Sequence, residues 1–253
     1  MTTGEGFRVD LHVKVLDERV VERAKQRGLD AVVYAPHFTR LPDIRCRAER
    51  FSDDELVVIP GRELFTGHWQ RRRHVLGVGL DEPIPDFITL EAALEELERQ
   101  GAAVLVPHPG FLTISLSAEE IAAFRDSIDA VEVYNPKFLP HHHRRARHIA
   151  VETGLPGFAS SYAHLRGTIG EAWTVFEGPV RDAAGLAEAI RGGSFRIEHR
   201  SGNGHRLRRV AELAHVGWEN SWEKFDRVFL SGTEPTHPGH VAYDGRFEDV
   251  RVY

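Results

Sequence analysis

Short apolar segments alternate with amphipathic helical segments along most of this chain, and this alternation restricts its fold more than any other feature. Between the apolar segments the pattern is helical, as at residues 89–100, where apolar side chains recur on one face. Strands that alternate with helices predict parallel βα units. Seven such strands predict an α/β protein with a closed or nearly closed barrel. The seven expected strands lie at residues 7–13, 30–35, 56–60, 74–80, 103–107, 130–134 and 156–160.

The length of 253 residues fits one large domain with a substantial core. We expect a single domain over residues 1–253, with the barrel core at about 7–200 and a C-terminal extension at 201–253. A further strand at 172–176 and a helix at 183–191 follow the seventh strand. In the extension, residues 207–229 are expected to form one or two helices.

The composition predicts a cytoplasmic protein. No apolar run approaches the ~20 residues that a membrane span needs, and the polar N-terminus lacks the apolar core of a signal peptide. A single cysteine, Cys46, excludes an internal disulfide and fits a reducing compartment. The net charge of −6 gives no general attraction to nucleic acid, which stays a possible partner without support from the charge. A small-molecule partner is expected, and no membrane partner.

Histidines and acids stand at the ends of successive predicted strands. Barrel enzymes build metal centres from imidazoles and carboxylates that several strand ends deliver to one place. Surface histidines would not follow the strands in this way, so the pattern predicts metal-assisted hydrolysis. The residues concerned are Asp10, His12, His37, Glu63, His74, His108, Glu132 and His164.

Three local motifs around these residues resemble the PHP family, the polymerase and histidinol phosphatase domain. The resemblance covers roughly residues 7–200. It implies a distorted (β/α)7 TIM-like barrel that binds up to three zinc, manganese or iron ions at its strand ends and mostly hydrolyses phosphoesters. The motifs that match are Gly61-Arg62-Glu63, His74-Val75-Leu76-Gly77 and His108-Pro109.

Three other positions depart from the family pattern. Lys14 replaces the second histidine of the first motif, Pro36 replaces an aspartate before His37, and Tyr162 replaces the aspartate of the last motif. The resemblance implies that one metal site, which needs the residues at 14 and 162, is lost. It implies that Glu63, His74 and His108 still hold one ion, and that His37 and His164 remain from a third site. His12 comes from the lost site. For His12, His37 and His164, metal ligation and a hydrogen-bonded structural role are both open. We therefore expect one or two divalent ions.

Lys14 shares one face of the first strand with Asp10 and His12, because side chains alternate along a strand. A buried ammonium is costly unless it is paired, and Glu63 is the expected partner. Lys14 then replaces one metal cation; the alternative is that it extends to solvent. Asp10 is expected to orient His12 or a nearby backbone segment.

The leading hypothesis is a metal-dependent phosphoesterase. The ion held by Glu63, His74 and His108 would polarise a phosphoryl oxygen and activate water. His37 or His164 would transfer a proton, and Lys14 would stabilise phosphoryl charge. The rival hypothesis is a catalytically degenerate barrel that binds a phosphorylated ligand or a protein. The arginines expected to bind the substrate are Arg40, Arg62 and Arg144.

Overall fold

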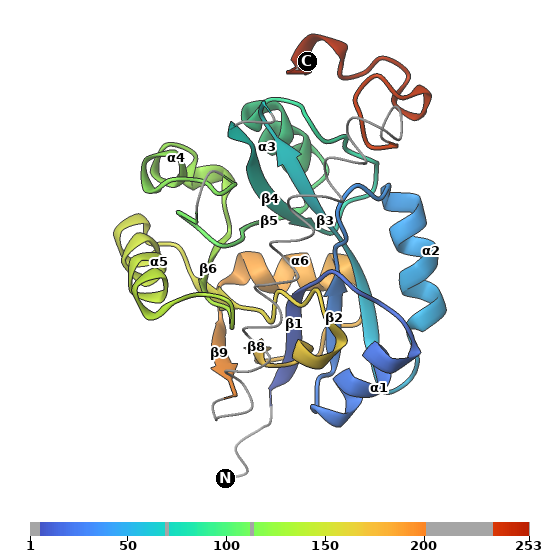
Figure 1. Cartoon of the computed structure of the whole chain (residues 1–253), viewed down its shortest axis with the longest axis vertical. Helices are drawn as coiled ribbons and strands as arrows, with labels where there is room; N and C mark the ends of the chain where they lie inside the picture. The colour runs from blue at the N-terminus through green and yellow to red at the C-terminus, as the bar shows by residue number, and fades with distance from the viewer. Residues whose placement is uncertain (1–5, 69–70, 112–113, 201–234, 253) are drawn as a thin grey trace.

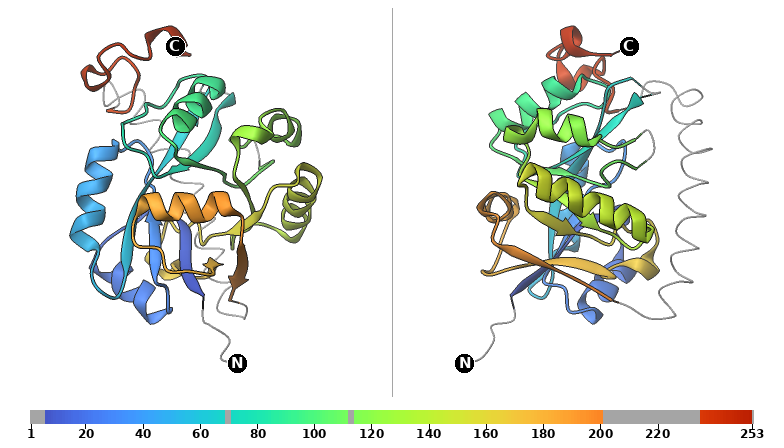
Figure 2. Two further views of the ribbon diagram at one scale, coloured as in Figure 1. Left: turned by 180° about the vertical axis from the view of Figure 1, so that it is seen from behind. Right: turned by 90° about the vertical axis from the view of Figure 1, so that its left-hand side faces the viewer.

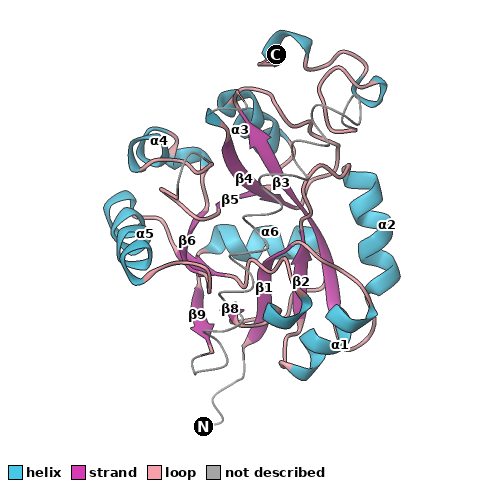
Figure 3. Cartoon of the chain, in the orientation of Figure 1, coloured by secondary structure: helices cyan, strands magenta, loops and turns pink. Residues whose placement is uncertain are grey.

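The described strands form one nine-stranded sheet, in the order β7-β6-β5-β4-β3-β2-β1-β8-β9. The computed structural model describes residues 6–68, 71–111, 114–200 and 235–252. The strands lie at the centre of the molecule and the helices around them (Figure 3). Their bounds are β1 Phe7–Val13, β2 Ala31–Tyr34, β3 Val57–Thr66, β4 Arg73–Val78, β5 Ala103–Val106, β6 Ala130–Tyr134, β7 Gly157–Ala159, β8 Ala172–Phe176 and β9 Phe195–His199.

The strands run parallel in two groups, β1–β2–β3 and β5–β6–β7, as the alternation predicts. Strand β4 is antiparallel to both β3 and β5, which differs from the expected parallel unit. The reason is the short connection between Thr66 and Arg73, because a parallel crossover needs a dozen or more residues. Strand β8 is also antiparallel to its neighbours β1 and β9.

The sheet curves into a nearly closed barrel. Strand β7 stands at one end of the strand order, and β8 is next to the other end. The hydroxyl of Thr174 on β8 donates to the Ala159 carbonyl of β7 at 2.9 Å and accepts from the Ala159 amide at 3.1 Å. One side chain therefore links β7 to β8. This architecture confirms the predicted α/β barrel class.

Helices surround the sheet (Figure 1), and α3, α4 and α5 follow one another along one side (Figure 2, right). The side chains of Asp17 and Thr89 accept hydrogen bonds from the amides of Val20 and Ala92, which caps α1 and α3. The predicted apolar stripe of α3 is buried. The helix bounds are α1 Glu18–Gln26, α2 Leu41–Phe51, α3 Leu90–Arg99, α4 Ala118–Ala123, α5 Pro140–Thr153 and α6 Ala183–Gly192.

The C-terminal segment at 235–252 lies beside α3 (Figure 1). Its Arg251 pairs with Ile88, and the Thr89 amide donates to the Val250 carbonyl at 3.0 Å. Within it, two short 3-10 turns form at Val241–Tyr243 and Glu248–Val250. The helices expected at 207–229 lie outside the described residues. Among the described helices, none has the length and apolar character needed to cross a membrane.

Candidate metal centre

The expected site residues converge at one end of the barrel. His12 lies on β1, Glu63 on β3 and His74 on β4, while His37 and His108 follow β2 and β5. Because β4 runs in the opposite direction, its first residues lie at the same end as the last residues of its neighbours. His12, Glu63, His74 and His108 are completely buried, so the centre is shielded from water.

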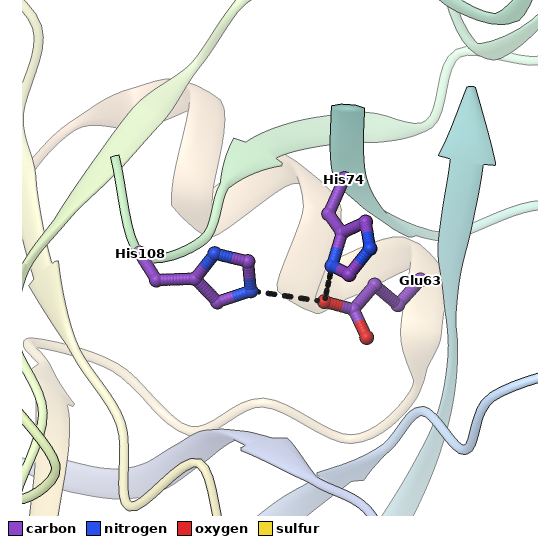
Figure 4. A group of neighbouring side chains, drawn as sticks. All are labelled: Glu63, His74 and His108. Carbon is purple, nitrogen blue, oxygen red and sulfur yellow. Dashed lines mark hydrogen bonds and ion pairs between the residues drawn. The ribbon is translucent and has the colours of Figure 1, made fainter. Parts of the chain in front are cut away.

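Glu63 faces two of these histidines through one oxygen (Figure 4). Its Oε1 lies 3.1 Å from His74 Nδ1 and 3.3 Å from His108 Nε2. The possible ligand atoms of these three residues lie within 4.8 Å of one another. Two ligands of a tetrahedral ion with bonds of 2.0–2.1 Å are about 3.3 Å apart, so the spacing matches a shared ion.

The tautomer of His108 is fixed by Ser115. The hydroxyl of Ser115 donates to the Phe111 carbonyl at 3.0 Å, so its lone pair accepts from His108 Nδ1 at 2.8 Å. His108 Nε2 therefore carries a lone pair that points at the carboxylate of Glu63. Two electron-rich atoms at 3.3 Å need a cation or a proton between them.

Glu132 holds His108 from behind. The buried Glu132 carboxylate accepts from the His108 amide at 2.8 Å, the Asn135 side chain at 2.8 Å and the Ser160 hydroxyl at 2.5 Å. Burial raises the pKa of Glu132 and outweighs these hydrogen bonds. His108 adopts a positive φ of 37°, a conformation that a non-glycine residue keeps only where its surroundings enforce it.

The second oxygen of Glu63 is held by Lys14. The Lys14 ammonium donates to Glu63 Oε2 and to the Ala35 carbonyl, the latter at 2.6 Å. His37 Nδ1 lies 2.9 Å from the same oxygen. Burial raises the pKa of Glu63, but Lys14 and the histidines outweigh it and hold that pKa well below its usual range. Lys14 is 8% exposed, so the expected pairing with Glu63 is confirmed and the alternative of extension to solvent is wrong.

His12 remains neutral beside this pair. Burial, followed by the charge of Lys14, lowers the pKa of His12 to about 3. Its Nε2 lies 3.6 Å from Glu63 Oε2, and neither ring nitrogen has a hydrogen-bond partner among the described residues. Buried, unpartnered imidazole nitrogens next to a carboxylate fit metal coordination. The donor set as a whole, imidazoles and one carboxylate, also suits a divalent ion.

A family model described as "PHP-associated" matches residues 140–195, from the start of α5 into β9. This match supports the resemblance of the chain to the PHP-domain family.

Other known proteins also resemble this chain. The uncharacterized protein MJ1587 of Methanocaldococcus jannaschii is 26% identical over 117 residues, which are 46% of this chain and 64% of that protein, just under two thirds of its length. The crystal structure of PsfC from Pseudomonas syringae has a TM-score of 0.61 at 20% identity and covers 84% of this chain and 98% of that one. An amidohydrolase from Chromobacterium violaceum has a TM-score of 0.49 at 14% identity and covers 62% of this chain and 87% of that one.

The ring of Tyr162, at the position of the last motif, packs against the rings of two histidines. Its centroid is 4.7 Å from that of His12 and 5.0 Å from that of His108. The segment that carries Tyr162 is anchored by Asp10, whose carboxylate accepts from the Ser161 amide at 2.8 Å and the Gly170 amide at 3.1 Å. The expectation that Asp10 orients a backbone segment is confirmed.

His164 meets a second lysine that the sequence analysis missed. Lys137 is buried, and its ammonium lies 2.5 Å from His164 Nδ1 and donates to the Tyr162 carbonyl. Burial, followed by Lys137, holds the pKa of His164 well below its usual range. The position of Lys137 just after the strand in Asn135-Pro136-Lys137 is the one sequence signal that could have drawn attention to it.

The three arginines expected to bind substrate are placed differently from one another. Arg62 is 1% exposed, and its guanidinium contacts Asp86 Oδ2 at 2.7 Å and the Glu63 carbonyl. The expectation that Arg62 binds the substrate is therefore wrong. Arg62 instead stabilises the backbone of Glu63 through the hydrogen bond to its carbonyl. Arg40 lies 3.4 Å from Asp43 and is partly exposed, and Arg144 is exposed on α5.

Proposed function

We propose that this PHP-domain chain is a metal-dependent hydrolase that acts on a phosphoester. The observation that supports this most is the buried triad of Glu63, His74 and His108, with ligand atoms within 4.8 Å of one another. The lone pair of His108 directed at Glu63 favours a cation between them. Zinc, manganese and iron all accept this combination of imidazole and carboxylate ligands.

A divalent ion bound at this triad supplies Lewis acidity toward a phosphoryl oxygen and lowers the pKa of water. The protein contributes the rest of the site. Ser115 and Glu132 hold His108 in one orientation, and the complete burial of the triad excludes bulk water. Such fixed polar groups act more strongly where water is excluded, because they need no reorganisation during the reaction.

We propose that Lys14 and His37 act on the substrate. Each is 8% exposed, while the triad is completely buried, so a ligand that approaches from solvent reaches these two side chains before it reaches the triad. In this proposal, Lys14 stabilises the negative charge of the phosphoryl group and His37 transfers a proton. His164 is less suited to proton transfer, because Lys137 occupies its Nδ1.

A second candidate function is a binding module for a phosphorylated ligand. The contact between Lys14 and Glu63 favours it, because this ammonium occupies an oxygen that the PHP pattern leaves to a metal. Lys14 and Lys137 would then bind the anion without turnover. The complete set of Glu63, His74 and His108 favours the enzyme over the binding module.

Elemental analysis and a phosphoesterase assay separate the two functions. The chain is purified without an affinity tag, its metal content is measured, and hydrolysis of p-nitrophenyl phosphate and bis-p-nitrophenyl phosphate is followed. The enzyme hypothesis predicts bound metal with turnover, and His108→Ala loses both. His148→Ala is the matched control, because His148 is exposed on α5, 70% by its side chain, and pairs with Glu152. Wild type that binds phosphate but neither holds metal nor turns over would support the binding module.

A further inference from the structure

Lys137 is fixed in place by a chain of buried hydrogen bonds. Its amide donates to Asn135 Oδ1 at 3.0 Å, and the Asn135 side chain donates to Glu132 at 2.8 Å. Glu132 also holds the amide of His108. The loop that presents Lys137 is thus tied to the same carboxylate that positions the metal triad.

The ammonium of Lys137 is held in a setting that stabilises positive charge. It donates to the carbonyl of Tyr162 and lies 4.0 Å from the centroid of the Tyr162 ring. A carbonyl oxygen and the face of an aromatic ring both attract a cation. The ring that replaces the family's aspartate at position 162 therefore forms part of the binding pocket for this ammonium.

The ammonium groups of Lys137 and Lys14 have similar contacts. Each ammonium is bound by one backbone carbonyl, of Tyr162 for Lys137 and of Ala35 for Lys14. Each also contacts an atom that can ligate a metal, His164 Nδ1 or Glu63 Oε2. An ammonium carries only donors, so it uses the same lone pair that a metal ion would need.

We propose that Lys137 is a built-in cation that masks His164 from metal ions. The centre then takes one ion at Glu63, His74 and His108, and none at His164. This inference rests on the proposed function for the ion at the triad and adds the reason why a further site stays closed. A second effect acts in the same direction, because an ammonium repels a divalent cation at short range.

The atoms that Lys137 covers have the spacing of metal ligands. His164 Nδ1 and the Tyr162 carbonyl oxygen are 3.1 Å apart, close to the ~3.3 Å that separates two ligands of one tetrahedral ion. The His37 ring lies beside them, its centroid 5.9 Å from that of His164. Removal of the ammonium exposes this donor group to an added ion.

The test measures Mn²⁺ and Zn²⁺ equivalents per chain by equilibrium dialysis and elemental analysis. We expect about one tightly bound ion in wild type and a second, weaker ion in Lys137→Met, since three or four ligand atoms suffice for a site. Lys137→Arg retains the charge and should match wild type. Lys137→Met with His164→Ala should lose the extra ion. Equal metal binding by wild type and Lys137→Met would overturn the proposal.

A separate variant covers the case in which Lys137→Met does not fold. His164→Ala alone should leave the number and affinity of bound ions unchanged, because a masked histidine contributes no ligand. A lower metal content in His164→Ala would overturn the proposal. Wild type without any metal would instead overturn the proposed function, and the comparison of Lys137→Met with wild type would still decide whether Lys137 masks His164.

Discussion

Replacement of Ser115 by alanine tests the metal centre through a residue that touches no metal. The Ser115 hydroxyl accepts from His108 Nδ1 at 2.8 Å and donates to the Phe111 carbonyl. Without it, the imidazole is free to place its proton on Nε2, the atom directed at Glu63. Ser115→Ala therefore weakens the triad without removing any of its three members.

The size of the effect follows from two terms. Loss of a partner that orients a metal-ligating histidine costs about 10–100-fold in metal affinity, which corresponds to about 1.4–2.8 kcal/mol. In the metal-free protein, the buried His108 Nδ1 hydrogen bond is lost, which lowers the free energy of unfolding by about 1–3 kcal/mol. The two terms are measured separately.

Competition with a chelator of known affinity gives the metal dissociation constant, and urea unfolding of the metal-free protein gives the stability. Ser127→Ala, in the 3-10 turn Arg125–Ser127, is the matched control. Metal affinity of Ser115→Ala within twofold of wild type, together with unchanged stability, would refute the role assigned to Ser115 and the tautomer deduced for His108.

Three further predictions concern buried charges. Lys14→Met leaves Glu63 without its ammonium and should lower the free energy of unfolding of the metal-free protein by roughly 3–5 kcal/mol in urea; a loss below about 1 kcal/mol would contradict the buried pair. Burial raises the pKa of Asp10 to about 6. Because the folded state then holds the proton more tightly than the unfolded state, wild type should lose roughly 2 kcal/mol relative to Asp10→Asn as the pH rises from 4 to 6. Urea titrations across this range check it, with the exposed Asp126→Asn as control, and parallel curves would refute it. Lys14→His combined with Tyr162→Asp should add about one metal ion per chain. Aspartate tolerates the φ of 47° at position 162, so the double variant should fold. A folded double variant without extra metal would show that Lys14 does not replace an ion.

The parts of the fold with long connections were predictable from the sequence. A helix between two strands leaves enough chain for a parallel crossover, and β1–β3 and β5–β7 follow this rule. The antiparallel direction of β4 was also predictable, because Thr66 and Arg73 are too close in sequence for a parallel crossover connection. The reversal of β8 had no comparable signal, since α6 separates it from β9.

The site was predictable where strand periodicity determines it. Glu63, His74 and His108 meet as expected because each is fixed by a strand or its immediate end. The same periodicity argues against Arg62 as a substrate ligand, because neighbours on a strand point to opposite faces and Glu63 faces the centre. Lys137 was not predictable, because its contact with His164 depends on how two loops, after β6 and after β7, approach each other.

The bond between Lys14 and Glu63 also changes how the centre depends on its surroundings. Occupancy of a dissociable ion follows the free metal concentration relative to its dissociation constant. An ammonium attached to the main chain is present in every folded molecule, however scarce the metal. One oxygen of Glu63, Oε2, therefore always has a cation beside it, because the Lys14 ammonium is part of the protein. Scarcity of metal can affect only the other oxygen, Oε1, which faces His74 and His108.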